Sequence, residues 1–412
     1  MSPLYEIYLK HRSISTDTRR IIPDSIFVAL RGASFDGNRF AAEALEKGAA
    51  YAVVDDPAVA VDARYIVVEN TLQALQALAR EHRRALQIPI LAIAGSNGKT
   101  TTKELVSRVV AQKYRIYATR GNLNNHIGVP LTLLAMGDEV EFGIVEMGAS
   151  ACGEIALLCS IAEPNYGLLT NVGRAHLEGF GGVEGVRRGK GELYDYLNAT
   201  GGTALLREED DTLTSMAEER PTLKRIAYTT SLADGIRHHL EGEYNRYNVA
   251  AAAAVGRFLE IEPAKIAAAI DSYHPDNNRS QREERATNTL IVDCYNANPS
   301  SMQLAVENMA KEKLENRSKK VLILGDMREL GAWSEEEHRT LIGQASKIDS
   351  ARLIFVGEEF RKALATMVGI QAEHHADCTA LRASLQEVPI RDALVLIKGS
   401  RGIGLERILE LL

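Results

Sequence analysis

The stretch Ile90–Thr101, which reads I-L-A-I-A-G-S-N-G-K-T-T, combines residue types that can bind a nucleoside triphosphate. Its first five residues are small or apolar and predict a buried strand, followed by a Gly-rich turn and a helix. In such a turn Gly95 and Gly98 bring backbone N–H groups close to phosphate oxygens. Lys99 supplies a cation, and the Thr100 hydroxyl is placed to bind magnesium at the helix N-terminus. The stretch therefore predicts a phosphate-binding loop.

One position departs from the standard phosphate loop. The pattern G-x-x-x-x-G-K-[ST] would place a glycine at position 93, where the chain has Ile93. The alternative interpretation is an ordinary strand-to-helix turn with a surface lysine. The apolar strand before the turn and the apolar helix face after it favour the nucleotide site.

Other polar residues follow strands or occupy loops of the same region. Glu146 belongs to the predicted strand Phe142–Met147, and a carboxylate at the end of a strand beside a phosphate loop is a suitable magnesium ligand. The loop G-N-L-N-N-H-I-G-V-P, which begins at Gly121, is rich in hydrogen-bond donors and acceptors. Glycine and asparagine are also favoured in loops that have no binding role, so this composition alone is weak evidence. His176 follows the predicted strand Leu168–Val172. It could be a metal ligand, a phosphate partner or a capped surface histidine.

The local sequence leaves three further groups of polar residues unassigned. Lys190 lies in R-R-G-K-G-E, which by itself predicts the start of a solvated basic helix. Asn245 and Asn248 precede an alanine-rich helix and lie one helical turn apart. Near the N-terminus two polar clusters could hold a diphosphate or a uracil edge, or could simply be solvated loops. Their members are Ser15, Asp17, Thr18, Arg19, Arg31, Asp36 and Asn38.

The composition is that of an ordinary globular protein. The chain has 412 residues, 45% hydrophobic and 25% charged, a length that corresponds to about three domains. Its net charge of −7 disfavours a sequence-independent nucleic-acid binder, and its four cysteines form no C-x-x-C pair, which predicts reduced core thiols. The N-terminus lacks a signal-peptide pattern, and no apolar run approaches the roughly 18 residues that span a bilayer. We therefore expect a cytoplasmic chain without membrane insertion.

The order of predicted strands and helices divides the chain into three α/β domains, at residues 1–86, 87–278 and 279–412. The central domain is expected to be a P-loop ATPase-like domain with a parallel sheet around the phosphate-binding loop. The first domain is expected to be small, with strands at Ile26–Leu30, Tyr51–Val54 and Tyr65–Val68 and helices at Phe40–Lys47 and from Leu72 towards Pro89.

In the third domain strand and helix patterns alternate, which predicts a doubly wound, Rossmann-like sheet. One of its helices is expected to begin at a capping box, Ser334-x-x-Glu337. Because no G-x-G-x-x-G is present, we do not infer a nicotinamide cofactor. Asp293, Asn296 and Asp326 follow strand ends, where ligands meet such sheets. The strands are expected at Leu290–Cys294, Val321–Leu324, Leu353–Val356 and Ala393–Ile397.

Eight motifs occur in one order along nearly the whole chain: G-S-N-G-K-T-T, G-N-L-N-N-H-I-G-V-P, E-M-G-A-S, N-V-G-R-A-H-L-E-G-F, G-K-G-E-L, D-C-Y-N-A-N-P, L-G-D-M-R-E-L-G and K-G-S-R. In this combination the chain resembles the Mur ligases of peptidoglycan synthesis. The resemblance implies a monomeric enzyme that uses ATP to join a carboxylate to an amine through an acyl phosphate. The implied substrates are UDP-N-acetylmuramoyl-tripeptide and D-alanyl-D-alanine, and the implied first domain binds UDP.

The resemblance also implies catalytic roles. Lys99 would face the γ-phosphate, and Thr100 and Glu146 would hold one magnesium ion. His176 matches the ligand of a second magnesium ion. Lys190 matches the family's carbamylated lysine, in which carbon dioxide converts an ammonium group into a carboxylate-like group beside the metal.

Nucleotide and substrate contacts follow from the same resemblance. Asn124 and Asn125 would position substrates near the reacting phosphate, and the two N-terminal clusters would bind the UDP-sugar end of the acceptor. Lys398, Ser400 and Arg401 would meet the carboxylate of the peptide or the dipeptide, although a basic helix start has the same pattern. ATP would contact Gly95, Ser96, Asn97, Gly98, Lys99, Thr100, Thr101, Asn245, Asn248, Asp293, Asn296 and Asp326.

Two departures from the family pattern and two alternatives accompany this interpretation. Tyr244 stands where family members commonly have histidine before Asn245, and the stretch 203–243 is short, which leaves its usual strands in question. A folylpolyglutamate synthase shares the central and C-terminal plan but does not account for the S-T-D-T-R and F-D-G-N segments. A non-catalytic nucleotide-binding scaffold would not need Lys99, Glu146, His176 and Lys190 together. The sequence does not distinguish diaminopimelate from lysine as the third residue of the acceptor peptide.

Overall fold

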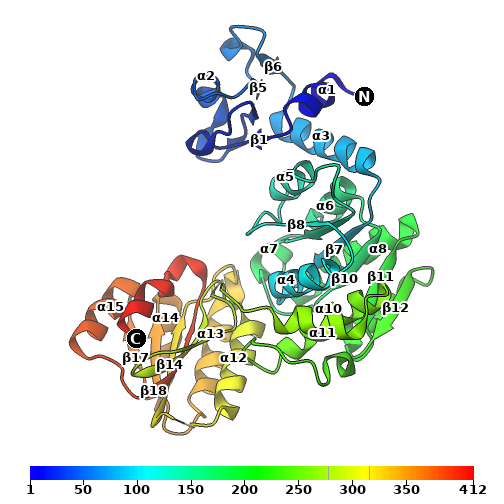
Figure 1. Cartoon of the computed structure of the whole chain (residues 1–412). Coiled ribbons are helices and arrows are strands. Elements are labelled where there is room, and N and C mark those ends of the chain that lie inside the picture. The colour runs from blue at the N-terminus through cyan, green and yellow to red at the C-terminus, as the bar shows by residue number, and fades with distance from the viewer. Residues whose placement is uncertain (277, 315) are drawn as a thin grey trace.

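The computed structural model describes residues 1–276, 278–314 and 316–412. It confirms the predicted α/β class: three sheets, each dominated by parallel strands, follow one another along the chain with helices packed on them. Figure 1 shows an extended arrangement in which the first sheet lies at one end, the central sheet in the middle and the third sheet at the other end. Among the described residues, no helix combines the length and apolarity needed to cross a membrane.

The first sheet is small and entirely parallel, in the order β1-β2-β5-β6. A two-stranded ribbon, β3 and β4, projects beside it. The strands are β1 Ile14–Ser15, β2 Ile26–Val28, β3 Arg31–Gly32, β4 Phe35–Asp36, β5 Tyr51–Val54 and β6 Tyr65–Val67, and the helices are α1 Pro3–Lys10, α2 Ala41–Glu46 and α3 Thr71–Leu86.

Helix α3 connects the first sheet to the rest of the molecule (Figure 1). Asn70 caps its N-terminus by accepting a hydrogen bond from the N–H of Gln73, and its apolar face is buried. Three side chains then bind main-chain carbonyls of the central region. The Tyr8 hydroxyl donates to the carbonyl of Leu134 at 2.6 Å, His82 Nε2 to Met136 at 2.8 Å, and Arg83 Nε to Ala162 at 2.8 Å. Buried polar bonds therefore join the apolar packing of α3 in holding the first domain.

The central sheet is parallel throughout, in the order β12-β11-β10-β7-β9-β8. Its strands are β7 Ile90–Ala94, β8 Ile116–Ala118, β9 Phe142–Glu146, β10 Tyr166–Leu169, β11 Thr203–Arg207 and β12 Lys224–Tyr228. Its helices are α4 Lys99–Val110, α5 Gly128–Leu134, α6 Glu154–Ala162, α7 Leu177–Phe180, α8 Val183–Thr200, α9 Asp211–Glu218, α10 Asn245–Phe258 and α11 Pro263–Asp271.

The structure corrects one expectation for the central region and answers one question that the sequence left open. The strand predicted at Leu168–Val172 runs from Tyr166 to Leu169, because Thr170 and Asn171 use their side chains to bind the carbonyl of Asn97 in the Gly-rich turn. The short stretch 203–243 retains two strands, β11 and β12, which pair with each other in parallel.

The third sheet has the order β13-β14-β18-β15-β16-β17, parallel except for the antiparallel edge strand β13. All four predicted strands are present, and β13 and β17 are additional. The strands are β13 Gln281–Glu284, β14 Asn288–Asp293, β15 Lys319–Gly325, β16 Arg352–Val356, β17 Glu373–His375 and β18 Ala393–Lys398, and the helices are α12 Pro299–Lys311, α13 Ser334–Ala345, α14 Glu358–Ala365 and α15 Cys378–Glu387.

The predicted capping box at Ser334 is wrong. Ser334 already has helical backbone angles as the first residue of α13, and its hydroxyl donates to Glu359 of α14 at 2.7 Å. The capping box of this domain lies instead at the start of α12, where Asn298 and Ser301 each bind the other's backbone N–H.

Candidate active site

The Gly-rich turn after β7 is shaped by two glycines with positive φ. Gly95 has φ +135°, and a Cβ there would lie 2.1 Å from Thr170 Oγ1. Gly98 has φ +79°, and a Cβ there would lie 2.5 Å from Asn248 Oδ1. Both positions need glycine for conformation and for space. Lys99 folds back over the turn and donates to the carbonyls of Gly95 and Ser96 at 2.8 and 3.0 Å. Burial lowers the pKa of Lys99 to about 8.

Glu146 lies at the end of β9, next to this turn, and its side chain contacts two polar groups. Its Oε1 accepts hydrogen bonds from Asn124 Nδ2 at 2.7 Å and from Thr100 Oγ1 at 3.3 Å. Its Oε2 is buried and has no hydrogen-bond partner among the described residues. A buried carboxylate oxygen of this kind is costly unless a cation or donor completes it. A carboxylate beside a threonine hydroxyl fits magnesium, which prefers oxygen ligands together with waters and phosphate oxygens.

His176 lies at the junction with the C-terminal domain. It has a left-handed backbone, φ +52°, and its Nδ1 pairs with the carboxylate of Glu329. This hydrogen bond lowers the pKa of Glu329. Among the described residues no group of three or more His, Cys, Asp or Glu side chains is arranged to hold a metal by itself. Any metal here would therefore need ligands from other residue types, water or substrate.

Lys190 is not at the solvated helix start that the local sequence predicts. It lies in the middle of α8, 1% exposed, with its ammonium 5.1 Å from the centre of the Phe180 ring. Its Nζ donates to the carbonyl of Ala149 at 3.0 Å. Burial, and secondarily the charge of Lys99, lower the pKa of Lys190 to about 7. A substantial fraction of this amine is uncharged near neutral pH.

A cavity of about 580 Å³ connects most of the predicted site residues. Its walls come from the central domain on one side and the C-terminal domain on the other. Gly95 and Lys190 do not line it, but each binds a group that does: Gly95 the ammonium of Lys99, and Lys190 the carbonyl of Ala149. The predicted residues on its walls are Ser96, Asn97, Gly98, Lys99, Thr100, Thr101, Asn124, Asn125, Glu146, His176, Asn245, Asn248, Asp293, Asn296 and Lys398.

The helix α10 presents Asn245 and Asn248 to this cavity. Asn248 Nδ2 donates to Asn245 Oδ1 at 2.7 Å, and Asn248 Oδ1 accepts from Thr102 Oγ1 at 3.0 Å. Tyr244, the residue before them, has its hydroxyl 3.0 Å from Ser280 Oγ, and burial raises its pKa. The three residues are therefore fixed to α4 and to the segment that leads into the C-terminal domain.

The C-terminal wall is built on two neighbouring strands. Asp293 ends β14 and Lys398 ends β18, in register, and their side chains form an ion pair at 2.5 Å. Ser400 and Arg401 do not reach the large cavity. They line an adjoining cavity of about 230 Å³ together with Arg328, Glu329 and His176.

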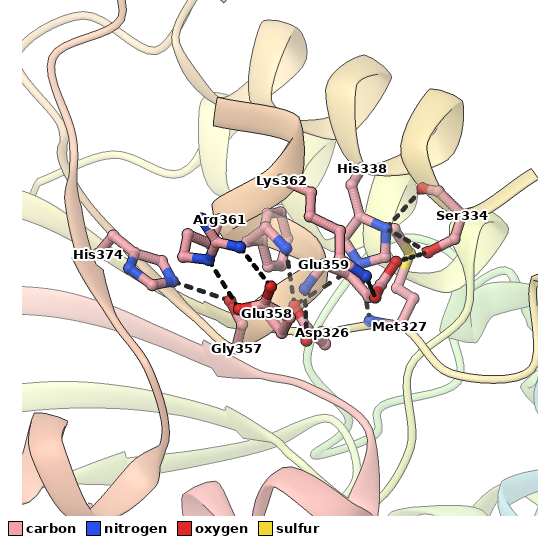
Figure 2. A network of polar contacts seen from close by, with 11 residues as sticks. Asp326, Met327, Ser334, His338, Gly357, Glu358, Glu359, Arg361, Lys362 and His374 are labelled. Atoms are coloured by element: carbon pink, nitrogen blue, oxygen red, sulfur yellow. Dashed lines mark hydrogen bonds and ion pairs between the residues drawn. The ribbon is translucent and has the colours of Figure 1, made fainter. Parts of the chain in front are cut away.

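Asp326 does not line the large cavity, contrary to the expectation from its place at a strand end. Its two carboxylate oxygens accept the backbone N–H groups of Glu359 and Phe360 at 3.0 and 2.9 Å, at the start of α14 (Figure 2). It therefore serves as a helix cap within the C-terminal domain.

The two N-terminal clusters lie on the first domain, away from the cavity (Figure 1). In one, Asp17 pairs with Arg19 at 2.7 Å, and Ser15 and Thr18 bind nearby groups through Ser15 Oγ and the Thr18 carbonyl. In the other, Asp55 accepts from both Arg31 and Asn38, at 2.8 and 2.7 Å, while Asp36 binds Asn38. Asp55 is a member that sequence reasoning missed.

Sequence reasoning also missed Arg279 and Glu329, which line the large cavity together with Tyr295 of the Y-N-A-N-P loop. The Arg279 guanidinium lies 3.8 Å from the centre of the Tyr295 ring, and that of Arg401 lies 4.9 Å from it. Tyr295 and Glu329 stand inside the motifs D-C-Y-N-A-N-P and L-G-D-M-R-E-L-G, so those motifs carried a usable signal. Arg279 lies in the segment between domains, where the local sequence offers none.

Comparisons with known proteins agree with this architecture. Residues 10–83 match the model of the Mur ligase family catalytic domain, residues 93–237 the Mur ligase middle domain, and residues 278–401 the Mur ligase glutamate ligase domain. The UDP-N-acetylmuramoyl-tripeptide–D-alanyl-D-alanine ligase of Bacillus subtilis is 32% identical, over 99% of this chain and 94% of its own.

Solved structures give the same result. A crystal structure of MurF from Acinetobacter baumannii superposes with a TM-score of 0.85 at 28% identity, over 97% of this chain and 92% of its own. MurF from Thermotoga maritima, in complex with ADP, superposes with a TM-score of 0.82 at 26% identity, over 100% and 98%. Three Mur ligase domain models match in order along the chain, and a full-length relative is 32% identical over 99% of it, so this protein belongs to the Mur ligase family.

Proposed function

We propose that this chain is an ATP-dependent ligase that joins D-alanyl-D-alanine to UDP-N-acetylmuramoyl-tripeptide. The peptide carboxylate attacks the γ-phosphorus of ATP and releases ADP, leaving an acyl phosphate. The amino group of D-alanyl-D-alanine then attacks the acyl carbon, phosphate leaves, and the nitrogen loses a proton as the amide forms. The observation that carries the proposal is the unpartnered oxygen of Glu146 beside the Gly-rich turn, in a cavity shared by two domains.

In this reaction the Gly-rich turn binds the triphosphate through its backbone N–H groups, and Lys99 places positive charge at the γ-phosphate. Thr100 and Glu146 would hold a magnesium ion, and His176 a second one. A bound magnesium ion neutralises phosphate charge and polarises the phosphorus for attack. Asn124 orients Glu146 by donating to its other oxygen. Asn125, whose side chain accepts from the N–H groups of Ile127 and Gly128, fixes the loop that faces the acceptor carboxylate.

Lys190 is proposed to carry a carbamate. Carbon dioxide reacts with an uncharged amine, and the lowered pKa of Lys190 supplies that form near neutral pH. The amine forms an N–C bond to carbon dioxide and releases one proton. The product is an anion that replaces a buried cation near Lys99, and the change of sign suits a site that binds magnesium.

The substrates are proposed to approach from opposite ends of the molecule. The first domain, residues 1–86, holds the UDP end of the acceptor through its two polar clusters. The C-terminal domain, residues 279–412, holds the dipeptide carboxylate through Lys398, Ser400 and Arg401, and ATP lies between it and the central domain, residues 87–278. We propose that the chain acts as a monomer. ATP and UDP-linked substrates are cytoplasmic, so we propose that the reaction takes place in the cytoplasm.

The decisive experiment measures phosphate release from ATP with UDP-N-acetylmuramoyl-tripeptide, with and without D-alanyl-D-alanine. We expect release to require both substrates and the product to be heavier by the dipeptide. Acceptors carrying diaminopimelate and lysine would be compared. The Lys99→Ala variant should fold and be inactive. Absence of release with either acceptor, despite ATP binding, would favour a folate-type ligase or a non-catalytic scaffold.

A further inference from the structure

A loop of the C-terminal domain, residues 326–331, reaches across to the central domain at His176. The carboxylate of Glu329 pairs with His176 Nδ1, and the carbonyl of Glu329 accepts the N–H of Glu178 at 3.2 Å. Glu329 and His176 both line the large cavity and the adjoining smaller one. The pair thus stands where the two domains meet at the proposed reaction centre.

Both residues of the pair have a left-handed backbone conformation, which residues other than glycine seldom adopt. Glu329 has φ +61° and His176 has φ +52°. Left-handed backbone at a residue with a long side chain is strained, and it persists only where the surroundings fix it. Two such residues facing each other across a domain boundary indicate a geometry that the fold maintains at a cost in stability.

The loop that carries Glu329 is held by His338, which binds the backbone of Met327 (Figure 2). His338 is fully buried on α13, and its Nε2 accepts the N–H of Met327 at 3.0 Å. Its Nδ1 donates to the carbonyl of Ser334 at 2.7 Å. Because Nε2 must keep a lone pair to accept this bond, the ring is neutral, with its proton on Nδ1. Burial lowers the pKa of His338 and favours this neutral form.

Neighbouring contacts fix the residues on either side of Met327. The N–H of Arg328 donates to Ser400 Oγ at 3.1 Å, and the N–H of Ser400 donates to the carbonyl of Asp326 at 3.1 Å. The Asp326 side chain in turn caps α14. Three consecutive residues are therefore held by α13, α14 and the segment after β18, and the next residue, Glu329, projects to the central domain.

We propose that Glu329 is a positioning residue for His176, delivered by a loop that His338 holds in place. The Glu329 carboxylate accepts the Nδ1 proton of His176, which fixes the ring and leaves the Nε2 lone pair for the cavity. A histidine that binds a metal through one nitrogen commonly donates through the other to a carboxylate, and that second contact tunes the site. The inference rests on the proposed role of His176. It means that the C-terminal domain completes the central domain's site.

The first test reads the protonation of His176 directly, in the full chain without magnesium or nucleotide. Nitrogen-15 NMR of histidine-labelled protein, with the His176 signals assigned through His176→Gln, distinguishes the proton on Nδ1 from the proton on Nε2. We expect Nδ1–H in the wild type and in Glu329→Gln, which keeps an acceptor oxygen. Glu329→Ala should move the equilibrium towards Nε2–H. Glu335→Ala, which removes an exposed carboxylate from the same domain, is the control and should match the wild type.

The second test measures amide formation. Glu329→Ala should lower kcat by about 10- to 100-fold, the usual effect of losing such a second contact, with little change in the KM for ATP, and Glu329→Gln should lose less. His338→Phe, which removes the acceptor for Met327, should change the His176 signals in the same direction, whereas His338→Gln should preserve them. Unchanged His176 signals and kcat in Glu329→Ala would overturn the proposal. An inactive wild type would instead contradict the proposed function, and the NMR result would still test the role of Glu329.

Discussion

Lys190 is a buried amine, and its ionisation bears on the stability of the fold and on the proposed carbamate. Burial lowers its pKa from 10.5 to about 7. Between these pH values the unfolded chain binds more protons than the folded chain, so the free energy of unfolding rises with pH across this window. We expect Lys190→Met to raise the melting temperature at pH 7 in carbon-dioxide-free buffer, with the difference shrinking towards pH 10, and to abolish ligation. Thermal unfolding followed by circular dichroism checks this.

The exposed Lys265 provides the matched control for this experiment. Lys265→Met removes the same charge without relieving any burial, so its melting temperature should follow that of the wild type at every pH. A constant difference between Lys190→Met and the wild type from pH 7 to pH 10 would contradict the assignment of the lowered pKa.

Individual residues were predictable from the sequence where the chemistry is local to one segment. Lys99 and Thr100 follow from the Gly-rich turn alone. Lys190 required the family resemblance, because R-R-G-K-G-E gives no sign that packing against Phe180 buries the lysine. Glu329 and Arg279 were missed because each acts on groups supplied by another part of the chain.

At the scale of elements, the turn between β7 and α4 depends on the absence of a side chain at Gly98. We expect Gly98→Ala to weaken ATP binding at least about tenfold, or ~1.4 kcal/mol, because the new Cβ would lie 2.5 Å from Asn248 Oδ1. Gly153→Ala is the control: φ is +89° there, also just before a helix, but a Cβ would meet nothing within 4 Å. It should cost about 1 kcal/mol of stability and leave ATP binding unchanged, as measured by calorimetry. Equal effects of both substitutions would show that space at Gly98 is unimportant.

Asp326 provides a second test at this scale, through helix α14. Because both of its oxygens accept N–H groups of that helix, Asp326→Ala should lower the free energy of unfolding by about 1–2 kcal/mol and leave the KM for ATP unchanged. Denaturant unfolding and initial rates measure the two quantities. Asp377→Ala, which removes the cap of α15, should have a similar effect on stability. A raised KM for ATP at unchanged stability would restore the nucleotide role first expected of Asp326.

Elements were predictable where apolar residues recur with a clear period. The buried strands β7, β9 and β18 follow from short apolar runs. The strands β13 and β17 were missed because Q-R-E-E and E-H-H lie at sheet edges, where charged residues are tolerated and no apolar pattern is needed. The end of β10 was misplaced because Thr170 and Asn171, which look like a continuation of the strand, turn to bind the Gly-rich loop.

At the scale of the whole molecule, polar groups join apolar packing in the contact between the central and C-terminal domains. Arg174 donates to Glu337 and Gln303, both at 3.0 Å, from across this boundary. We expect Arg174→Ala to favour separated domains by about 1–3 kcal/mol, because Glu337 is buried and would lose its charged partner. Energy transfer between dyes on the two domains, measured without nucleotide, should decrease, and so should kcat. Arg188→Ala, at an exposed position of the central domain, is the control. Unchanged energy transfer in Arg174→Ala would mean that other contacts hold the domains.

The first domain is attached in a different way, and this has a consequence for exchanging domains between relatives. Three of the groups on α1 and α3 that dock it, Tyr8, His82 and Arg83, donate to main-chain carbonyls, whereas Arg84 pairs with the side chain of Glu163. Every amino acid has a main-chain carbonyl, so these hydrogen bonds tolerate substitutions on the surface of the central domain. We therefore expect residues 1–86, which include α3, to be exchangeable as one unit. A chimera that joins the first domain of a relative to this chain at Gln87 should dock correctly and inherit the acceptor preference of the donor.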